Sequence, residues 1–148
     1  MTDLHQKLMD TAYDRYKSEG ISRAEFLDSL SAQERFAVHT GNFCYQVQNG
    51  GFMQWWDNQY GTAEVVEYLL RAMARVGTET TKKVEDLLLV YKKSMELRKR
   101  DRRDRDCYDA DGDWEEMSKE LDGLETAFYA IDDQFLKDCE AHLQKGGW

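Results

Sequence analysis

The chain has 148 residues, of which 41% are apolar and 33% are charged, and its formal net charge is -9 at pH 7. This composition is typical of a folded domain, and no apolar run approaches the roughly 18 residues that cross a bilayer. The net negative charge disfavours nucleic acid and anionic membranes as direct partners and favours basic ones. The first ten residues lack the basic start and apolar run of a secretory signal, so a cytoplasmic protein is expected.

Cysteine and proline usage narrows the class of fold. Cys44, Cys107 and Cys139 show no CxxC or Cys/His spacing, so neither a disulfide framework nor a zinc site is expected. The chain contains no proline. Because proline marks turns and sheet edges, its absence predicts a chain built almost wholly of helices joined by glycines and capped ends.

Helix signals begin near the N-terminus. Apolar residues recur at helical spacing over residues 4–16, and Gly20 is predicted to end that helix. Two capping boxes follow, Ser22 with Glu25 and Ser31 with Glu34, and each is predicted to open a helix. The second of these helices carries an apolar stripe that steps by 4, 3 and 4 residues, formed by Phe36, Thr40, Phe43 and Val47.

A double glycine then predicts a corner between two helices. Gly50 is expected in the left-handed conformation just past a helix end, and Gly51 would let the chain re-enter a helix at a sharp angle. The aromatic residues that follow fall at i, i+3 and i+4, so Phe52 and at least one tryptophan should pack against the 31–48 helix. The structural motif comprises Asn49, Gly50, Gly51, Phe52, Trp55 and Trp56.

The rest of the chain also has helical periodicity. Helices are predicted over residues 65–76, ended by Gly77, and from residue 84 onward, where the apolar stripe fades by Leu97 and the charged run RKRDRRDRD suits an exposed helix end. Residues 107–116 are predicted as a loop, and Asp122 with Glu125 as the start of a last helix that runs to residue 143. No alternating strand pattern occurs. The sequence therefore predicts one all-α domain over residues 1–148, with roughly six to eight helices.

Catalytic chemistry has little support. His5, His39 and His142 lie far apart in the sequence, and none has a carboxylate or cysteine at a recognisable motif spacing. His39 lies one position beyond the stripe of its helix and is expected to be partly exposed. No nucleophile elbow, P-loop or zinc-protease motif is present. The chain is therefore expected not to be an enzyme, and an unrecognised hydrolase is the weaker alternative.

A metal site is also not expected. The segment CYDADGDWEEMS resembles a calcium loop, because Asp109, Asp111 and Gly112 fall at loop positions 3, 5 and 6. Positions 1 and 12 are then Cys107 and Ser118, where an aspartate and a bidentate glutamate are required. The segment is interpreted as a solvated acidic turn, and no cofactor is predicted.

Charge is distributed unevenly along the chain. The basic residues between Lys92 and Arg105 are interrupted by acids, which favours a solvated helix over a phosphate-binding face. Residues 104–140 then hold fourteen acids and three bases. Such a stretch can be mere solvating surface, or it can hold carboxylates in rows like DNA phosphates and bind a basic protein. The candidate partner-binding acids are Asp104, Asp106, Asp109, Asp111, Asp113, Glu115, Glu116 and Glu120.

Two segments resemble a known family. The stretches LSAQERFAVHTGNFCYQVQNGGFMQWWDNQYG and LETAFYAIDDQFLKDCEAHLQ resemble the bacterial DMP family of DNA-mimic proteins over roughly residues 26–145. The N-G-G-F motif of that family matches residues 49–52, and its following polar positions match Gln54 and Asn58. Its late aromatic pair matches Phe128 and Tyr129, with two aspartates shortly after.

The resemblance implies an all-α fold and, for the DNA-mimic type, an acidic dimer that occupies the DNA site of a transcription regulator. The basic middle of this chain departs from a uniformly phosphate-like surface. The function expected is that of a non-catalytic acidic protein that binds a basic partner, and a DNA-binding regulator is the partner expected first. A non-mimic interaction protein, such as an immunity factor against a basic toxin, is the alternative.

Overall fold

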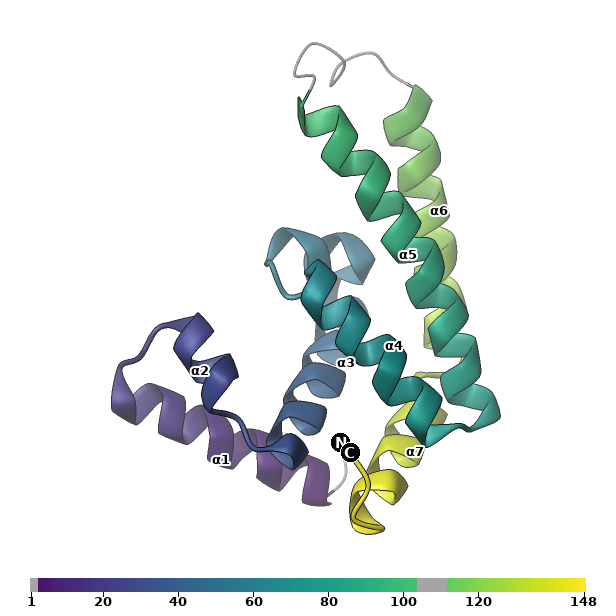
Figure 1. Ribbon diagram of the computed structural model, residues 1–148. Helices are drawn as coiled ribbons and strands as arrows, with labels where there is room; N and C mark the ends of the chain where they lie inside the picture. Colours follow the sequence, from purple (N-terminus) through teal and green to yellow (C-terminus); the bar gives the residue numbers. More distant parts are fainter. Residues whose placement is uncertain (1–2, 104–111) are drawn as a thin grey trace.

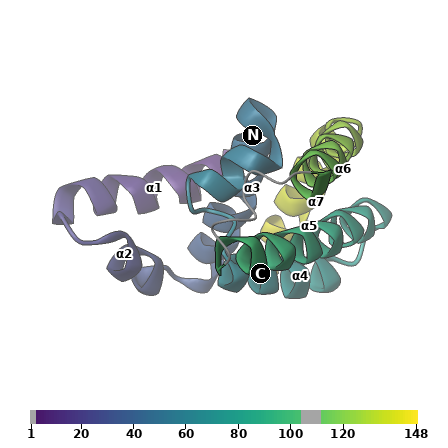
Figure 2. The ribbon, with the colours of Figure 1, turned by 90° about the horizontal axis from the view of Figure 1, so that it is seen from above.

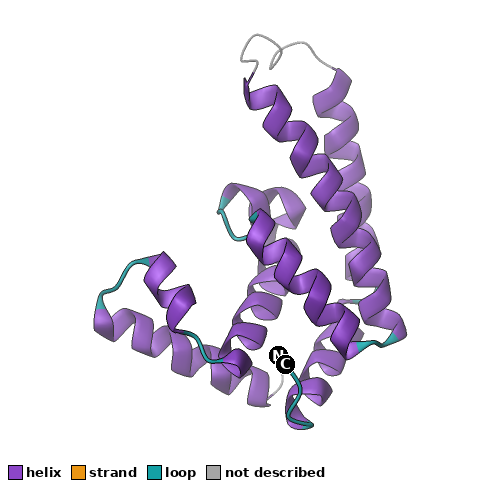
Figure 3. Cartoon of the chain, viewed as in Figure 1, coloured by secondary structure: helices purple, strands orange, loops and turns teal. Residues whose placement is uncertain are grey.

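The computed structural model of the chain describes residues 3–103 and 112–148, and within these ranges it contains helices and short connections but no strand (Figures 1 and 3). Side chains are described over residues 4–96 and 119–148. The seven helices of the described ranges are α1 (Asp3–Glu19), α2 (Arg23–Ser29), α3 (Ala32–Asp57), α4 (Ala63–Val76), α5 (Glu79–Arg103), α6 (Gly112–Tyr129) and α7 (Asp132–Gln144). The predicted all-α fold is confirmed.

The predicted caps start and stop the helices, but only one of the two predicted capping boxes is complete. At α3 the Ser31 hydroxyl accepts from the Glu34 amide at 3.1 Å, and the Glu34 carboxylate accepts from the Ser31 amide at 3.0 Å. The Ser22 hydroxyl accepts from the Glu25 amide at the start of α2. Gly77 ends α4 in the left-handed conformation, with φ of 69°. These local bonds explain why the helix starts could be read from the sequence.

The long helix α3 lies at the centre of the molecule. Both ribbon views place α1 and α2 on one side of it and α5, α6 and α7 on the other (Figures 1 and 2). Helix α3 contacts α1, α4, α6 and α7. Its apolar side chains therefore reach two packing layers at once, which accounts for its many fully buried residues.

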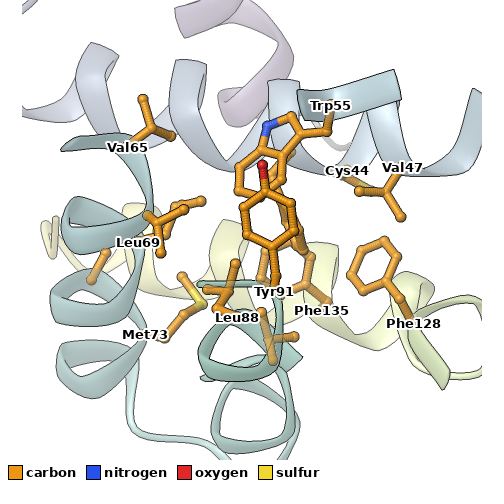
Figure 4. Packing of buried hydrophobic residues seen from close by; sticks show 14 of the residues in the cluster. Cys44, Val47, Trp55, Val65, Leu69, Met73, Leu88, Tyr91, Phe128 and Phe135 are labelled. Carbon is orange, nitrogen blue, oxygen red and sulfur yellow. The ribbon is translucent and has the colours of Figure 1, made fainter. Parts of the chain in front are cut away.

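Most buried side chains form one core between α3 and the helices α4 to α7 (Figure 4). Phe43 is its centre, and its ring lies 4.9 to 5.9 Å from four other aromatic rings, those of Phe52, Trp55, Phe128 and Phe135. The offset and edge-on geometries are those that aromatic rings prefer. A smaller cluster fixes α2 against α1 and α3, and its buried members are Ala12, Phe26, Leu30 and Val38.

A buried polar network joins the two ends of the chain. The Glu140 carboxylate on α7 accepts from the backbone amides of Leu4 and His5 in the first turn of α1, at 3.0 and 2.9 Å. The His5 ring bonds the hydroxyl of Thr40 on α3 at 2.8 Å. A carboxylate at a helix N-terminus satisfies free amides and opposes the positive end of the helix dipole. This network fixes α1 against α3 and α7.

Two predicted boundaries were wrong. Asp122 does not start a helix, because α6 begins at Gly112 and passes through it, so residues 112–116 of the predicted loop are helical. The last helix is not continuous either, since the chain turns at Ala130 and Ile131 between α6 and α7. The apolar residues on both sides of this turn keep helical spacing, so the sequence pattern predicted one continuous helix. Residues 107–111 of the predicted loop lie outside the described residues.

Among the described residues, no helix is both long and apolar enough to span a bilayer. Cys44 and Cys139 are free and buried, and burial raises the pKa of the Cys44 thiol to about 12. Such thiols remain protonated and unreactive at neutral pH.

Candidate functional site

The double-glycine corner is an abrupt bend inside α3. Gly50 has φ of -156° and ψ of 15°, and Gly51 has φ of 77° and ψ of -175°. The left-handed backbone therefore occurs at Gly51, one residue later than predicted. A side chain at Gly51 would also collide with the Glu125 carboxylate of α6, because a Cβ there would lie 2.5 Å from its oxygen. The backbone angles and the close approach of α6 both require glycine at residue 51.

The aromatic residues after the corner belong to the core. Phe52 is 1% exposed and Trp55 is fully buried, whereas Trp56 is half-buried. The rings of Trp55 and Tyr91 lie 4.8 Å apart, and Figure 4 shows them one over the other. The Tyr91 hydroxyl donates to the carbonyl of Gly61 at 2.8 Å, which fixes the loop that follows α3. These aromatic groups hold α3 against α5 rather than presenting a surface to a partner.

Polar groups stabilise the corner on its outer side. The Tyr129 hydroxyl of α6 lies within hydrogen-bond distance of three acceptors, the Val47 carbonyl at 2.9 Å, the Gln48 carbonyl at 3.2 Å and the Glu125 carboxylate, and its single proton is shared among them. The bend leaves carbonyls at the end of the first half of α3 without helical partners, and Tyr129 meets this need. The sequence matched Phe128 and Tyr129 to the late aromatic pair of the family but did not predict that Tyr129 supports the bend. The carbonyls that Tyr129 contacts lie about eighty residues away along the chain.

Two further amides cross the bend. The Gln46 side-chain carbonyl accepts from Gln54 at 3.0 Å and from Asn58 at 2.9 Å. Residues before and after the corner are thereby joined. Of the six residues in the predicted structural motif, Asn49 and Gly50 are the two that are exposed, and they lie at the surface of the bend.

Four of the eight predicted partner-binding acids lie on α6, whose beginning forms an arm with the far end of α5. Figure 1 shows the far end of α5 and the beginning of α6 extending beyond the other helices. Glu120 is the one member of the set whose side chain is described, and it is exposed. Asp113, Glu115 and Glu116 lie on the backbone of α6. Outside the described residues are Asp104, Asp106, Asp109 and Asp111.

Other acids of α6 and α7 divide into two groups. Asp122 and Asp133 are exposed, as is Glu120, and all three side chains lack an ion pair within the described part of the chain. The remaining acids have internal partners. Asp132 accepts a hydrogen bond from Gln48, and Asp138 accepts one from Thr78. Glu125 accepts from Tyr129, and Glu140 accepts from two backbone amides. The exposed acids are therefore the ones free to meet a partner.

The basic part of the chain lies next to this acidic part. Helix α5 carries nine bases and five acids, whereas α6 carries six acids and one base. The two helices contact one another. Lys92 of α5 forms an ion pair with Glu67 of α4, so this base is directed at a neighbouring helix. The basic run of α5 therefore lies beside the acids of α6. The order of residues in the sequence does not show that these two helices are neighbours.

The three histidines are not assembled into a catalytic group. His5 bonds Thr40, the His39 ring stacks on that of Tyr68 at 4.8 Å, and the His142 ring packs against Phe36 at 5.3 Å. Burial lowers the pKa of His5 and of His39 to about 4. The expectation of a partly exposed His39 was wrong, because its side chain is 8% exposed beneath Tyr68. Within the described residues, no group of three or more potential metal ligands comes together.

Comparison with known proteins gives one result. No curated protein and no solved structure matches the chain. The family model described as DMP19-like protein matches residues 28–145, which span α3 to α7 and most of the chain. The chain therefore belongs to the DMP19-like protein family.

Proposed function

We propose that this protein is a non-catalytic, acidic binding protein, and that it acts as a DNA mimic by occupying the DNA-binding surface of a basic protein such as a transcription regulator. Membership of the DMP19-like family supports the proposal. The observation that carries it is the presence on α6 and α7 of exposed acids without ion pairs, namely Glu120, Asp122 and Asp133 within the described side chains.

Rigid presentation of these carboxylates favours mimicry. The inner face of α6 is buried and is formed by Leu121, Leu124 and Phe128. The inner face of α7 is likewise buried and is formed by Phe135 and Leu143. Helices anchored by a core hold their outer side chains at fixed separations, as DNA holds its phosphates. A carboxylate offers the same bidentate acceptor to arginine as a phosphate does. A basic protein can therefore bind such acids at low cost in lost conformational freedom.

The expected mode of binding is electrostatic. Acids exposed on a surface speed association and set specificity, and their effect weakens as salt screens it. A DNA-binding partner would place the interaction in the cytoplasm. We include no catalytic step, because the one hydroxyl bonded to a described histidine, that of Thr40, is fully buried and donates to the Phe36 carbonyl.

A pull-down from the native host, followed by competition with duplex DNA, tests the proposal. We expect a captured DNA-binding protein that duplex DNA displaces, with affinity that falls as salt rises. The triple variant Glu120→Lys, Asp122→Lys and Asp133→Lys should lose that partner. The matched control reverses three exposed acids on α1 and α2, Asp14→Lys, Glu19→Lys and Glu25→Lys, and should retain it.

Three outcomes would contradict the proposal in different ways. Retention of the partner by the first triple variant would show that the α6–α7 acids are not the interface. A partner that DNA fails to displace would identify a non-mimic interaction protein, of which an immunity factor is one kind. Loss of the partner in both triple variants would indicate a general effect of net charge rather than a specific surface.

A further inference from the structure

A groove away from the acidic arm lies where α2 and α3 meet the start of α4. Its volume is about 510 Å³, which is within the range of small-molecule sites. Eleven residues from these three helices line it, and the ones that matter chemically are Arg35, His39, Glu64, Tyr68 and Arg71. An adjoining hollow of about 370 Å³ shares Arg35 and Tyr68 with it.

The floor of the groove holds polar groups with no protein partner. His39 is 8% exposed and lines the groove, and its ring makes no hydrogen bond within the described part of the chain. Neither ring nitrogen is among the fully buried, unpartnered side-chain atoms, so the ring can be reached from the groove. Its ring stacks on that of Tyr68, whose hydroxyl likewise bonds no described group. Both side chains line the groove, where a ligand could reach them.

Arginines dominate the charge around this floor. Arg35 and Arg71 line the groove, and Arg75 lines the adjoining hollow. Burial is the largest cause that lowers the pKa of His39, and the charges of Arg35 and Arg23 lower it further. Burial raises the pKa of Tyr68 to about 12, although the three arginines of the groove and hollow oppose the rise. At neutral pH the floor therefore offers an uncharged imidazole and a phenol in a positive field.

The start of α4 adds to this field, and three acids oppose it. Thr62, Ala63 and Glu64 form the first turn of α4, where free backbone amides and the helix dipole favour an anion. Asp28 and Glu64 also line the groove and are exposed, whereas Glu67 is paired with Lys92. No carboxylate is among the main charges acting on His39 or Tyr68. The positive part of the groove is thus its floor.

We propose that this groove binds a small molecule through an anionic oxygen group, a carboxylate or a phosphate. His39 and Tyr68 donate hydrogen bonds to that group, and Arg35 and Arg71 balance its charge. Leu27 and Val65 supply the apolar part of the wall. This inference goes beyond the proposed function, since the groove is separate from α6 and α7 and takes a small ligand rather than a basic protein.

Nuclear magnetic resonance of the full chain tests the site, with inorganic phosphate and acetate as separate probes at constant ionic strength. We expect saturable shifts confined to His39, Tyr68 and the first turn of α4. Saturation with phosphate alone would identify a phosphate site, and saturation with acetate would identify a carboxylate site. The pKa of His39 should rise when the probe is bound, because an anion favours the charged imidazolium.

Two variants separate the groove from the rest of the surface. Arg71→Gln removes an exposed arginine and should fold normally, and we expect roughly tenfold weaker binding from the loss of one charge-assisted contact. Lys137→Gln is the matched control, since its residue is exposed on α7, which contributes nothing to the groove lining. It should bind as the parent does.

Other results would overturn the proposal. Linear shifts spread over many basic residues would show only a general response to salt. Equal weakening by Arg71→Gln and Lys137→Gln would show that net charge, and not the groove, decides binding. An unchanged pKa of His39 at saturation would remove this residue from the site. None of these results bears on the acidic face of α6 and α7, which is tested through its protein partner.

Discussion

At the scale of single residues, the double glycine and the aromatics after it solve one packing problem. Gly51 lets α3 bend and lets Glu125 of α6 come close. The bend directs Phe52 and Trp55 into the core, where they meet Phe43. In the N-G-G-F stretch the Phe52 ring therefore serves the core, whereas Asn49 is exposed.

Replacement of Phe52 by alanine tests its place in the core. Because the ring is 1% exposed and packs on Phe43 and Tyr91, Phe52→Ala should lower the free energy of unfolding by about 3–5 kcal/mol. Tyr45→Ala is the control, since it removes an aromatic ring from the same helix at a site that is 42% exposed. It should cost within about 0.5 kcal/mol. Urea unfolding measures both, and equal midpoints would place Phe52 at the surface.

Two glycine-to-alanine changes should have opposite signs. At Gly51 the positive φ with extended ψ is a conformation that alanine rarely adopts, so Gly51→Ala should destabilise by about 1–3 kcal/mol. At Gly123, inside α6, a Cβ meets no atom within 4 Å, so Gly123→Ala should stabilise by about 0.5–1 kcal/mol.

The double variant Gly51→Ala with Glu125→Ala separates the two causes at the corner. Relief of the cost in the double variant would assign it to the collision with the carboxylate. Persistence of the cost would assign it to the backbone. If Gly51→Ala were neutral, the bend described at this residue would be wrong.

At the scale of elements, α6 has two duties. Its inner face contributes Leu121, Leu124 and Phe128 to the core. Beside that face, Tyr129 contacts carbonyls that the bend in α3 leaves open. The same helix carries exposed acids on its outer side, including Asp122. A helix that supports the bend and presents charge to a partner must be rigid, which suits the proposed mimicry.

Loss of the Tyr129 hydroxyl measures its contribution to the bend. Tyr129→Phe keeps the ring and removes the hydrogen bonds to α3, so we expect a loss of about 0.5–1.5 kcal/mol in the free energy of unfolding. Tyr45→Phe serves as the control and should be neutral, because Tyr45 is exposed. Hydrogen exchange of the amides around the bend should quicken in Tyr129→Phe alone. Unchanged exchange would mean that other contacts suffice.

At the scale of the whole molecule, charge and burial are separated. Exposed acids lie on α1, α2, α4 and α5 as well as on α6 and α7, and a groove with three arginines in and beside it lies at the junction of α2, α3 and α4. Between them the core encloses His5 and partly covers His39. Because both imidazoles are held neutral, the stability of the fold depends on pH.

We expect stability to fall as the pH drops below about 6.5. The pKa of His5 and of His39 is lowered from 6.5 to about 4 on folding, so the unfolded chain binds more protons between these values. The stabilisation is complete above pH 6.5 and is lost as the pH falls toward 4, on the order of 2–3 kcal/mol for each histidine. Urea midpoints measured from pH 7.5 to pH 4.5 check the trend. Histidine ring resonances that titrate near pH 6.5 would contradict it.

The sequence by itself determined the helical class, the capped starts of α2 and α3, the glycine stop of α4 and the inward face of the aromatic segment. These features rest on contacts within a few residues, such as Ser31 with Glu34, or on the periodicity of one helix. The acidic residues of the sequence also predict that the protein binds a basic partner protein, and this prediction stays a proposal.

The tertiary structure alone decided the features that depend on distant residues. Gly51, and not Gly50, takes the left-handed backbone, and Glu125 of α6 lies against it. Tyr68 of α4 covers His39, which periodicity had placed near the surface. The last predicted helix divides at Ala130 because the core contacts of Phe128 and Phe135 are made from two helices. Local patterns carry no information on which helix will lie beside which, and burial and the groove follow from that choice.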